Sequence, residues 1–257
     1  KGAVMGDTFG LENVLWFSEN KKNAYEEPTF KRSRAHDYVE KEVNAVRNYV
    51  GCNEIANFSK HLFIGKDSRL FIDKVFAGST PSKGRICLSP MVSHKGKLLG
   101  DLTVACLDDE KFMIFGSGAL QEMHRRWFET QINEYKLEYK NCSDDWHGFS
   151  ISGPKSRKLL SRICRDDLNP SSFKFRDIRE TYVGGVPCLL NRMSFTGELG
   201  YEVYTSPQFH LKLFEEIENN GEDLKLSLFG SRALMSLRLE KNWGAWTLDY
   251  RPDFTIL

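Results

Sequence analysis

The sequence predicts an α+β fold made of two related layers, each with an antiparallel sheet and helices. Two observations lead to this prediction. Strand-like runs joined by tight turns alternate with amphipathic helical segments, and one strand–turn–helix pattern occurs twice, around Gly65 and Gly153. A chain of 257 residues is long enough to bury a sizeable core, as one large domain or two small ones.

The first part of the chain, residues 1–50, is expected to hold an arm and a first helix. Residues 1–35 are aromatic and charged without a clear period, which is typical of an arm that wraps around a larger body. The segment "DYVEKEVNAVRNYVG" then places four valines at helical spacing and ends at Gly51, a residue type that often follows a helix C-terminus.

The repeat defines the two layers. In "ANFSKHLFIGKDSRLFIDKVF" a strand, a turn at Gly65 and a helix follow one another, and "WHGFSISGPKSRKLLSRIC" repeats this order around Gly153. Aligned on these glycines, the two stretches share a serine and an arginine at the same offsets. Because only two copies are visible, a pair of similar layers, residues 51–146 and 147–257, is favoured over a solenoid.

The remaining segments complete each layer. Between the copies, "GRICLSPMVSHKGKLLGDLTVACLDDEKFMIFGSG" predicts three strands joined by tight turns, and "ALQEMHRRWFETQINEY" predicts a helix. After the second copy, "TYVGGVPCLLNRMSFTGELGYEVYTS" predicts another antiparallel set. The stretches "FHLKLFEEIENN" and "SRALMSLRLEK" predict two more helices.

Composition excludes several classes of function. Lys and Arg number 36 against 35 Asp and Glu, so the net charge gives no reason to expect a nucleic acid or a membrane surface as partner. The apolar runs are far shorter than the roughly 20 residues that cross a bilayer, and the start lacks the layout of a signal peptide. We expect a cytoplasmic protein.

No metal or nucleophile motif stands out. The six cysteines are scattered singly and are expected to be free thiols, mostly buried, and the six histidines are too far apart to predict a metal site. No phosphate-binding, dinucleotide-binding or serine-hydrolase fingerprint occurs.

Three stretches carry candidate functional residues, and the first is "GKLLGDLTV". An alternating strand would place Leu99, Asp101 and Thr103 on one face and apolar residues on the other. Aspartate is a poor strand former, so Asp101 is a candidate for chemistry. The residues alone leave open a simpler role, a bond to a nearby backbone amide.

The second stretch is "FTGELGYEV", in which two glycines bracket Glu198. Glycines on both sides indicate a sharp turn that carries the glutamate toward something close by. A carboxylate accepts two parallel hydrogen bonds, which suits an amino-pyrimidine edge as well as an arginine. A hairpin turn with a solvated glutamate is the alternative.

The third stretch is "LFGSRALMSLRLEK", where Ser231 is expected to cap a helix and Arg232 falls in its first turn. Cations are disfavoured at that positive end, so Arg232 is expected to have an anionic partner. Arg238 and Glu240 on the following turns are expected to form a structural salt-bridge set.

Taken in that order, the three stretches resemble the folate-binding aminomethyltransferase family, which contains the glycine-cleavage T-protein. The resemblance is closer to the folate domains of dimethylglycine and sarcosine dehydrogenases and of dimethylglycine oxidase. It runs over nearly the whole chain, through "MGDTFGLENVLWF", "GRICLSPMVSHKGKLLGDLTV", "SISGPKSRKLL", "MSFTGELGYEV" and "SLRLEKNWGAW".

The resemblance implies two related layers around a central cavity for tetrahydrofolate. It implies that Asp101 is the catalytic acid, that Glu198 holds the amino-pyrimidine edge of the pterin, and that Arg232 meets the glutamyl carboxylate of the tail. Leu88 and Tyr201 match further cofactor-binding positions. Transfer of a methylene group needs a nucleophilic amine, an electrophilic carbon and removal of one proton, so one oriented carboxylate is sufficient.

The sequence departs from the T-protein pattern at several positions, and these departures bear on which branch of the family it resembles. T-proteins usually have a pair of aspartates where this chain has Gly100 and Asp101, a tyrosine where it has Leu88, and a second tyrosine where it has Phe195. The first departure favours the dehydrogenase-type folate domains. The family also continues into a small C-terminal barrel, which is apparently missing from a sequence that ends at "YRPDFTIL".

The function implied is a tetrahydrofolate-dependent one-carbon transferase. It would act on the carbon of an N-methylated amine, such as dimethylglycine or sarcosine, or of an aminomethyl donor, and form 5,10-methylenetetrahydrofolate. A separate FAD-dependent amine dehydrogenase or a lipoyl carrier protein would supply the carbon. The alternatives are a folate-dependent demethylase that yields 5-methyltetrahydrofolate and a non-enzymatic folate-binding protein.

Overall fold

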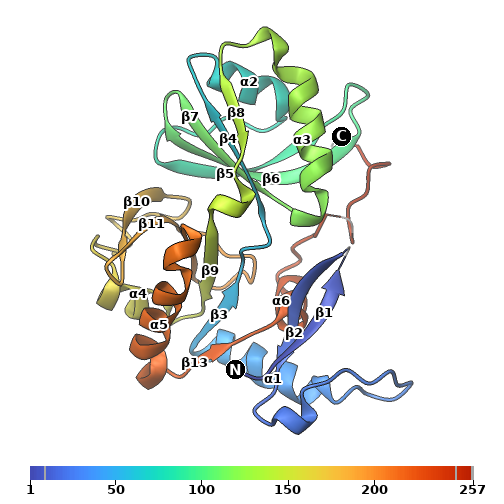
Figure 1. The fold of residues 1–257 in the computed structure, drawn as a ribbon, viewed down its shortest axis with the longest axis vertical. Helices are drawn as coiled ribbons and strands as arrows, with labels where there is room; N and C mark the ends of the chain where they lie inside the picture. The colour runs from blue at the N-terminus through green and yellow to red at the C-terminus, as the bar shows by residue number, and fades with distance from the viewer. Residues whose placement is uncertain (9, 247, 256–257) are drawn as a thin grey trace. The chain divides into compact units, whose positions relative to one another are not determined.

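The structure is a computed structural model that describes residues 1–8, 10–246 and 248–255, and its helices and antiparallel sheets confirm the predicted α+β class (Figure 1). The described residues divide into two compact units. We call them the first unit, which comprises Lys1–Ile55, Gly148–Lys174 and Glu180–Trp243, and the second unit, which comprises Ala56–His147, Phe175–Arg179 and the stretch from Gly244 onward.

A six-stranded sheet forms the framework of the first unit. Its strands follow the spatial order β10 (Ile178–Val183), β11 (Val186–Asn191), β12 (Gly200–Thr205), β9 (His147–Ser152), β3 (Val50–Glu54) and β13 (Leu226–Leu228). The pairs β11–β12 and β3–β9 are antiparallel, whereas β13 runs parallel to β3.

Helices and a hairpin complete the first unit. The helices are α1 (Ala35–Asn48), α4 (Ser156–Ile163), α5 (His210–Gly221) and α6 (Ser231–Glu240), with short 3₁₀ turns η1 (Lys21–Asn23), η5 (Pro207–Phe209) and η6 (Glu222–Leu224). The hairpin pairs β1 (Ala3–Thr8) with β2 (Leu11–Phe17) in antiparallel fashion.

A five-stranded sheet forms the framework of the second unit. Its spatial order is β5 (Arg85–Val92), β6 (Leu98–Asp108), β7 (Lys111–Gly116), β4 (Ser59–Ile64) and β8 (Glu138–Asn141), and the recorded pairs are antiparallel. The helices are α2 (Ser68–Val75) and α3 (Gln121–Gln131), with 3₁₀ turns η2 (Gly118–Leu120), η3 (Ile132–Glu134) and η4 (Ser143–Asp145).

The predicted repeat is present, with one copy in each unit. The segment β4–α2 turns at Gly65 with φ of 142°, and β9–α4 turns at Gly153 with φ of 124°. In each copy the serine three residues later donates its backbone N–H to the glycine carbonyl over 3.0 Å. A Cβ at Gly65 or Gly153 would lie 2.6 or 2.5 Å from a backbone oxygen, so both turns require glycine.

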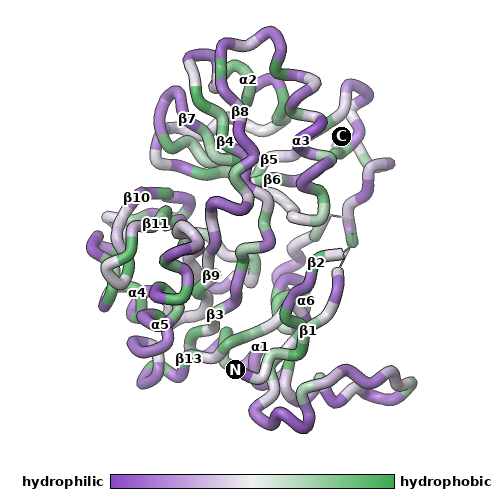
Figure 2. Tube along the Cα trace, in the orientation of Figure 1, coloured by the Kyte–Doolittle hydropathy of each residue, from purple (hydrophilic) through white to green (hydrophobic). Residues whose placement is uncertain are grey.

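Each unit has its own hydrophobic core. The core of the first unit collects Val50, Ile151, Leu159 and Val203, among others, while that of the second unit is rich in aromatic rings such as Phe63. Figure 2 shows hydrophobic colouring along strands of both sheets. Strand β12 is buried along its whole length, whereas β5 alternates between buried and more exposed residues.

Two local expectations were wrong. The N-terminal residues do not form an irregular arm throughout, because Ala3–Thr8 and Leu11–Phe17 pair as a hairpin. The first helix ends at Asn48 rather than at the predicted glycine, and Gly51 lies inside β3. A Cβ there would be 2.5 Å from Val46 Cγ2, so this glycine serves close packing of the strand on α1.

Two further findings concern membrane-spanning helices and the state of the cysteines. Among the described residues, no helix combines the length and the apolar character needed to cross a membrane. All six cysteines are free thiols, of which Cys87 and Cys164 are only partly buried.

Candidate functional site

Asp101 lies on β6 opposite Pro90 of the neighbouring strand β5. Its carboxyl is largely withdrawn from solvent, and this burial raises its pKa to about 6, although a bond to its own backbone opposes the shift. Within the described part of the chain, no ion pair or hydrogen bond from another residue reaches this carboxyl. The structure therefore presents a partly buried acid without a neighbouring cation among the described residues.

The opposite face of β6 explains Gly100. A Cβ at Gly100 would lie 2.9 Å from His124 Nε2, and one at Gly116 would lie 3.2 Å from His124 Nδ1. The imidazole on α3 is thus packed over two bare backbones, and burial lowers its pKa to about 4. An aspartate at position 100 would collide with His124, a residue that the sequence gave no reason to single out.

Leu88 lies on the same face of the second unit's sheet as Asp101. It pairs with Thr103, two residues from Asp101, and cross-strand partners project to the same face. Its side chain is 40% exposed. The structure thus places these two predicted site residues on the same face of one sheet.

Glu198 lies in the connection between β11 and β12. Gly197 has φ of 74°, which confirms the predicted sharp turn. The turn is fixed because the Glu198 N–H donates to Thr196 Oγ1 over 3.2 Å and the Glu198 carbonyl accepts from Ser194 Oγ over 3.0 Å. The carboxylate itself lies 3.3 Å from Lys241 Nζ, so it is an oriented acceptor at the end of α6.

Arg232 lies in the first turn of α6 and has the anionic partner that its position predicted. Its Nη2 donates to Glu26 Oε2 over 2.9 Å, and the other carboxylate oxygen of Glu26 accepts from the indole N–H of Trp16. Sequence reasoning missed both Glu26 and Trp16, since nothing local indicates a pairing across 206 residues.

One expectation about α6 was wrong. Ser231 does not cap the helix, because Gly230 is the N-cap and the Ser231 hydroxyl donates to Asn13 Oδ1 over 3.1 Å. Near the end of the helix, Glu240 forms an ion pair with Arg47, and Arg238 donates to the carbonyl of Trp243 over 3.0 Å.

Tyr201 belongs to the core of the first unit. Its side chain has no exposed surface, its ring stacks on Phe173 at a centroid distance of 6.1 Å, and its hydroxyl accepts from Arg157 Nε over 3.1 Å. A role in cofactor binding stays a prediction, as does the central folate cavity.

Helix α6 relates Glu198 to Arg232. Arg232 lies in its first turn, and Lys241, the partner of Glu198, is the C-cap residue. Nine residues at 1.5 Å per residue separate the two ends by about 14 Å. The Glu198 carboxylate and the Arg232 guanidinium thus lie near opposite ends of α6.

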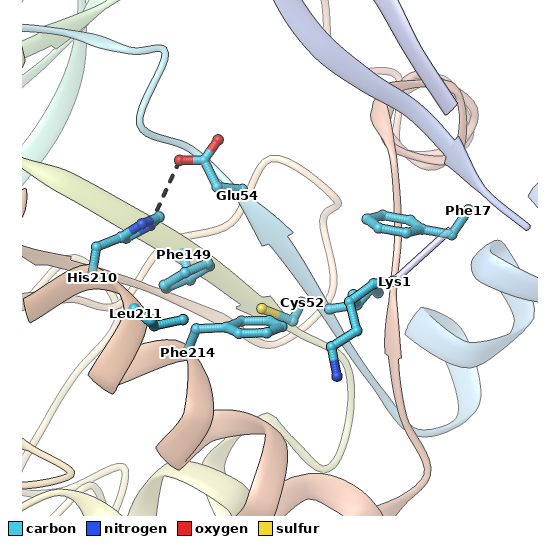
Figure 3. A pocket seen from close by; sticks show the side chains of 9 residues that line it. Lys1, Phe17, Cys52, Glu54, Phe149, His210, Leu211 and Phe214 are labelled. Carbon is cyan, nitrogen blue, oxygen red and sulfur yellow. Dashed lines mark ion pairs between the residues drawn. The ribbon is translucent and has the colours of Figure 1, made fainter. Parts of the chain in front are cut away.

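A cavity of about 310 Å³ also lies in the first unit. Its walls are mainly apolar, as Figure 3 shows, and the ring of His210 stacks on Phe149 at 4.4 Å while its Nε2 lies 3.7 Å from Glu54. None of Asp101, Glu198 and Arg232 lines it. We therefore assign it no part in the site.

Comparison with known proteins identifies the relatives of this chain. A human protein named mitochondrial dimethylglycine dehydrogenase is 32% identical over 253 residues, which cover 97% of this chain and 29% of that protein. An aminomethyltransferase of Halothermothrix orenii is 29% identical over 204 residues, which cover 79% of this chain and 56% of that enzyme. The chain thus spans less than two thirds of either relative.

Solved structures share the fold. The aminomethyltransferase T of the glycine cleavage system from Bartonella henselae matches 99% of this chain and 63% of its own, with a TM-score of 0.82 and 19% identity. A chain of the heterotetrameric sarcosine oxidase from Corynebacterium sp. U-96 matches 77% of this chain with a TM-score of 0.56 and 17% identity.

The family model described as the GCVT N-terminal domain matches residues 1–257. This match over the full length, together with the fold and the relatives, shows that the chain belongs to the GCVT family, that of the glycine-cleavage T-protein.

Proposed function

We propose that this chain carries out tetrahydrofolate-dependent one-carbon transfer and forms 5,10-methylenetetrahydrofolate. The observation that supports this most directly is Asp101, a partly buried carboxyl whose pKa is raised to about 6 by burial and which has no cationic partner among the described residues. Such an acid is poised to stabilise a positively charged reactant and to move a proton near neutral pH.

The residues of the first unit fit the cofactor by the chemistry of their donor and acceptor groups. Glu198 would accept from the amino-pyrimidine edge, since its backbone is fixed by Ser194 and Thr196 and its carboxylate has two acceptor oxygens. Arg232 would bind the tail carboxylate, for which its planar guanidinium is suited. When bound, tetrahydrofolate supplies the nucleophilic nitrogens that accept the carbon.

Asp101 has a different task from these binding residues. Its ionised form would attract the cationic carbon donor and hold it in place, and the low polarity around it strengthens that attraction. The same carboxylate would take up the single proton that the transfer releases. A second acid is not required, which agrees with the glycine that precedes Asp101.

The carbon donor is proposed to derive from an N-methylated amine such as dimethylglycine. The support is the relative named dimethylglycine dehydrogenase, at 32% identity over 97% of this chain, together with this chain's departures from the T-protein pattern at Gly100 and Leu88. A separate FAD-dependent amine dehydrogenase is the proposed source of the carbon.

Calorimetry and product analysis test the proposal. We expect wild type to bind tetrahydrofolate, and to yield a product with the mass of the methylene form when an amine-oxidising component and dimethylglycine are supplied. Asp101→Asn is expected to bind the cofactor and not to turn over. Asp109→Asn, which alters an exposed carboxylate on the turn after β6, is the matched control and should behave as wild type.

A folded wild type that binds no tetrahydrofolate would rule out the proposal. A product with the mass of 5-methyltetrahydrofolate would show that the chain catalyses demethylation instead of methylene transfer.

A further inference from the structure

The carboxylate of Glu26 is held by two donors from different elements of the first unit. Arg232 Nη2 on α6 donates to one oxygen over 2.9 Å, and the indole N–H of Trp16 on β2 donates to the other. The Arg232 and Glu26 side chains are 39% and 29% exposed, whereas Trp16 is fully buried. The two donors therefore hold a carboxylate that is partly open to solvent.

Both donors are fixed by the fold. Trp16 lies in β2 opposite Val4, and its ring stacks on Tyr38 at a centroid distance of 4.8 Å. Arg232 is in the first turn of α6. A buried indole N–H needs an acceptor, because an unpaired buried donor is destabilising. Any carboxylate that replaced Glu26 would satisfy both donors at once.

The acceptor lies in a less constrained part of the chain. Glu26 is in the connection between η1 and α1, residues 24–34, which contains no helix or strand. Figure 1 shows this connection reaching out beside α1, and Figure 2 shows that it is mostly hydrophilic. Its side chains include the exposed Tyr25 and Phe30. Few buried contacts hold it, so it is the movable partner of the three.

We propose that Trp16 and Arg232 together form the subsite for the tail carboxylate of the ligand, and that Glu26 fills this subsite until the tail displaces it. The inference rests on the proposed function, since it takes Arg232 as the tail-binding residue. It adds Trp16 as a second donor to the ligand and Glu26 as an internal competitor. The exchange replaces one carboxylate by another and leaves no buried donor unpaired.

Glu26→Gln is the direct test, with Glu27→Gln as matched control. Glu27 is the adjacent residue and pairs with Arg34 over 3.0 Å, away from the subsite. A neutral amide competes less well for a guanidinium, so Glu26→Gln is expected to bind tetrahydrofolate about threefold to fivefold more tightly. Binding of 6-methyltetrahydropterin, which lacks the tail, should be unchanged in both variants.

A double-variant experiment tests Trp16 separately. Trp16→Phe alone should change affinity little, since it weakens the hold on Glu26 and on the tail alike. In the Glu26→Ala background the same change should weaken tetrahydrofolate binding about threefold, because only the contact to the tail remains to be lost. Thermal melting of each variant checks that it is folded.

Different outcomes would rule out the internal competitor, the Trp16 donor and the proposed function. If wild type binds tetrahydrofolate but Glu26→Gln binds it equally well or less well, the internal competitor is ruled out while the proposed function stands. If Trp16→Phe has no effect in the Glu26→Ala background, Trp16 is not a ligand donor. If folded wild type binds neither compound, the proposed function fails, and this inference fails with it.

Discussion

Asp101 shows how the burial of one acidic residue can oppose stability. Burial raises the pKa of its carboxyl from 3.8 to about 6, so at neutral pH the folded protein holds an ionised group that would be better solvated in the unfolded chain. The folded state binds the proton more tightly than the unfolded state between these values. Its contribution therefore favours folding below about pH 4 and is lost as the pH rises through 6.

Asp101→Asn should consequently stabilise the protein at pH 8. We expect the free energy of unfolding to rise by about 1 to 3 kcal/mol, since each unit of pKa shift corresponds to about 1.4 kcal/mol. The gain should shrink as the pH is lowered toward 4. Urea titrations at several pH values measure it, with Asp109→Asn as control, and a loss of stability at pH 8 would contradict the interpretation.

Glu198 carries a second prediction at this scale. Glu198→Ala should weaken tetrahydrofolate binding by about 1 to 3 kcal/mol, because the amino groups of the ring would be left without an acceptor. Calorimetry measures the effect, and Glu215→Ala on the exposed face of α5 provides the control. Equal affinities for the two variants would remove Glu198 from the binding site.

Single residues also show where sequence reasoning ends. The position of Arg232 in a helical first turn was enough to predict an anionic partner, because the helix end itself disfavours a cation. The identity of that partner was not predictable, since Glu26 is brought there only by the folded chain. His124 was missed for the same reason: its contact with Gly100 joins a helix to a strand.

At the scale of elements, the repeated turn after β4 and β9 depends on its glycines. Gly153 combines φ of 124° with a Cβ position 2.5 Å from the carbonyl oxygen of Val46. Gly185 also has a positive φ, 75°, but its Cβ would meet nothing within 4 Å. Substitution of Gly185 would therefore cause backbone strain alone, whereas substitution of Gly153 would cause both backbone strain and a steric clash.

Gly153→Ala should be far more destabilising than Gly185→Ala. The latter adds only the strain of an L-residue at positive φ, about 1 to 2 kcal/mol. The former should lose about 3 kcal/mol or more, because a backbone oxygen has to move as well. Denaturant midpoints compare the two, and similar losses would show that the turn of the repeat adapts.

The elements that were missed share a physical cause. The sequence of the β1–β2 hairpin shows no clear alternation of apolar and polar residues. Strand β1 buries only one of its residues, so its sequence is not constrained to alternate. Strands β3 and β13 are short and lie directly beside helices, so the helical pattern of "DYVEKEVNAVRNYVG" hid the strand that begins at Val50. Periodic segments with a buried face, such as α4, were found because their signal is local.

At the scale of the whole molecule, the two units should respond oppositely to acid. In the second unit, burial lowers the pKa of His61 to about 3 and of His124 to about 4. The unfolded chain therefore binds more protons from pH 6.5 downward, and the unit loses stability there. The raised pKa of Asp101 has the opposite effect on stability, but it is one group against the two histidines. In the first unit, burial raises the pKa of Glu42 to about 7, so acid adds stability.

Hydrogen exchange followed by mass spectrometry tests this difference. Between pH 7 and pH 5, corrected for the intrinsic exchange rate, protection should fall in β4, β6 and α3 and be kept or increased in α1 and β2. His36→Gln, which alters an exposed histidine, should change neither pattern. A parallel loss in both units would show that these buried groups do not govern the response.

The parallel pairing of β13 with β3 sets an order of events during synthesis. Every strand of the five-stranded sheet has left the ribosome soon after Asn141, whereas the six-stranded sheet stays incomplete until Leu226–Leu228 can align beside Val50–Cys52. At usual elongation rates this is a delay of roughly 4 to 17 seconds. During it, β2 and the side chain of Trp16 lack their packing partner α6, so this surface stays uncovered in the nascent chain.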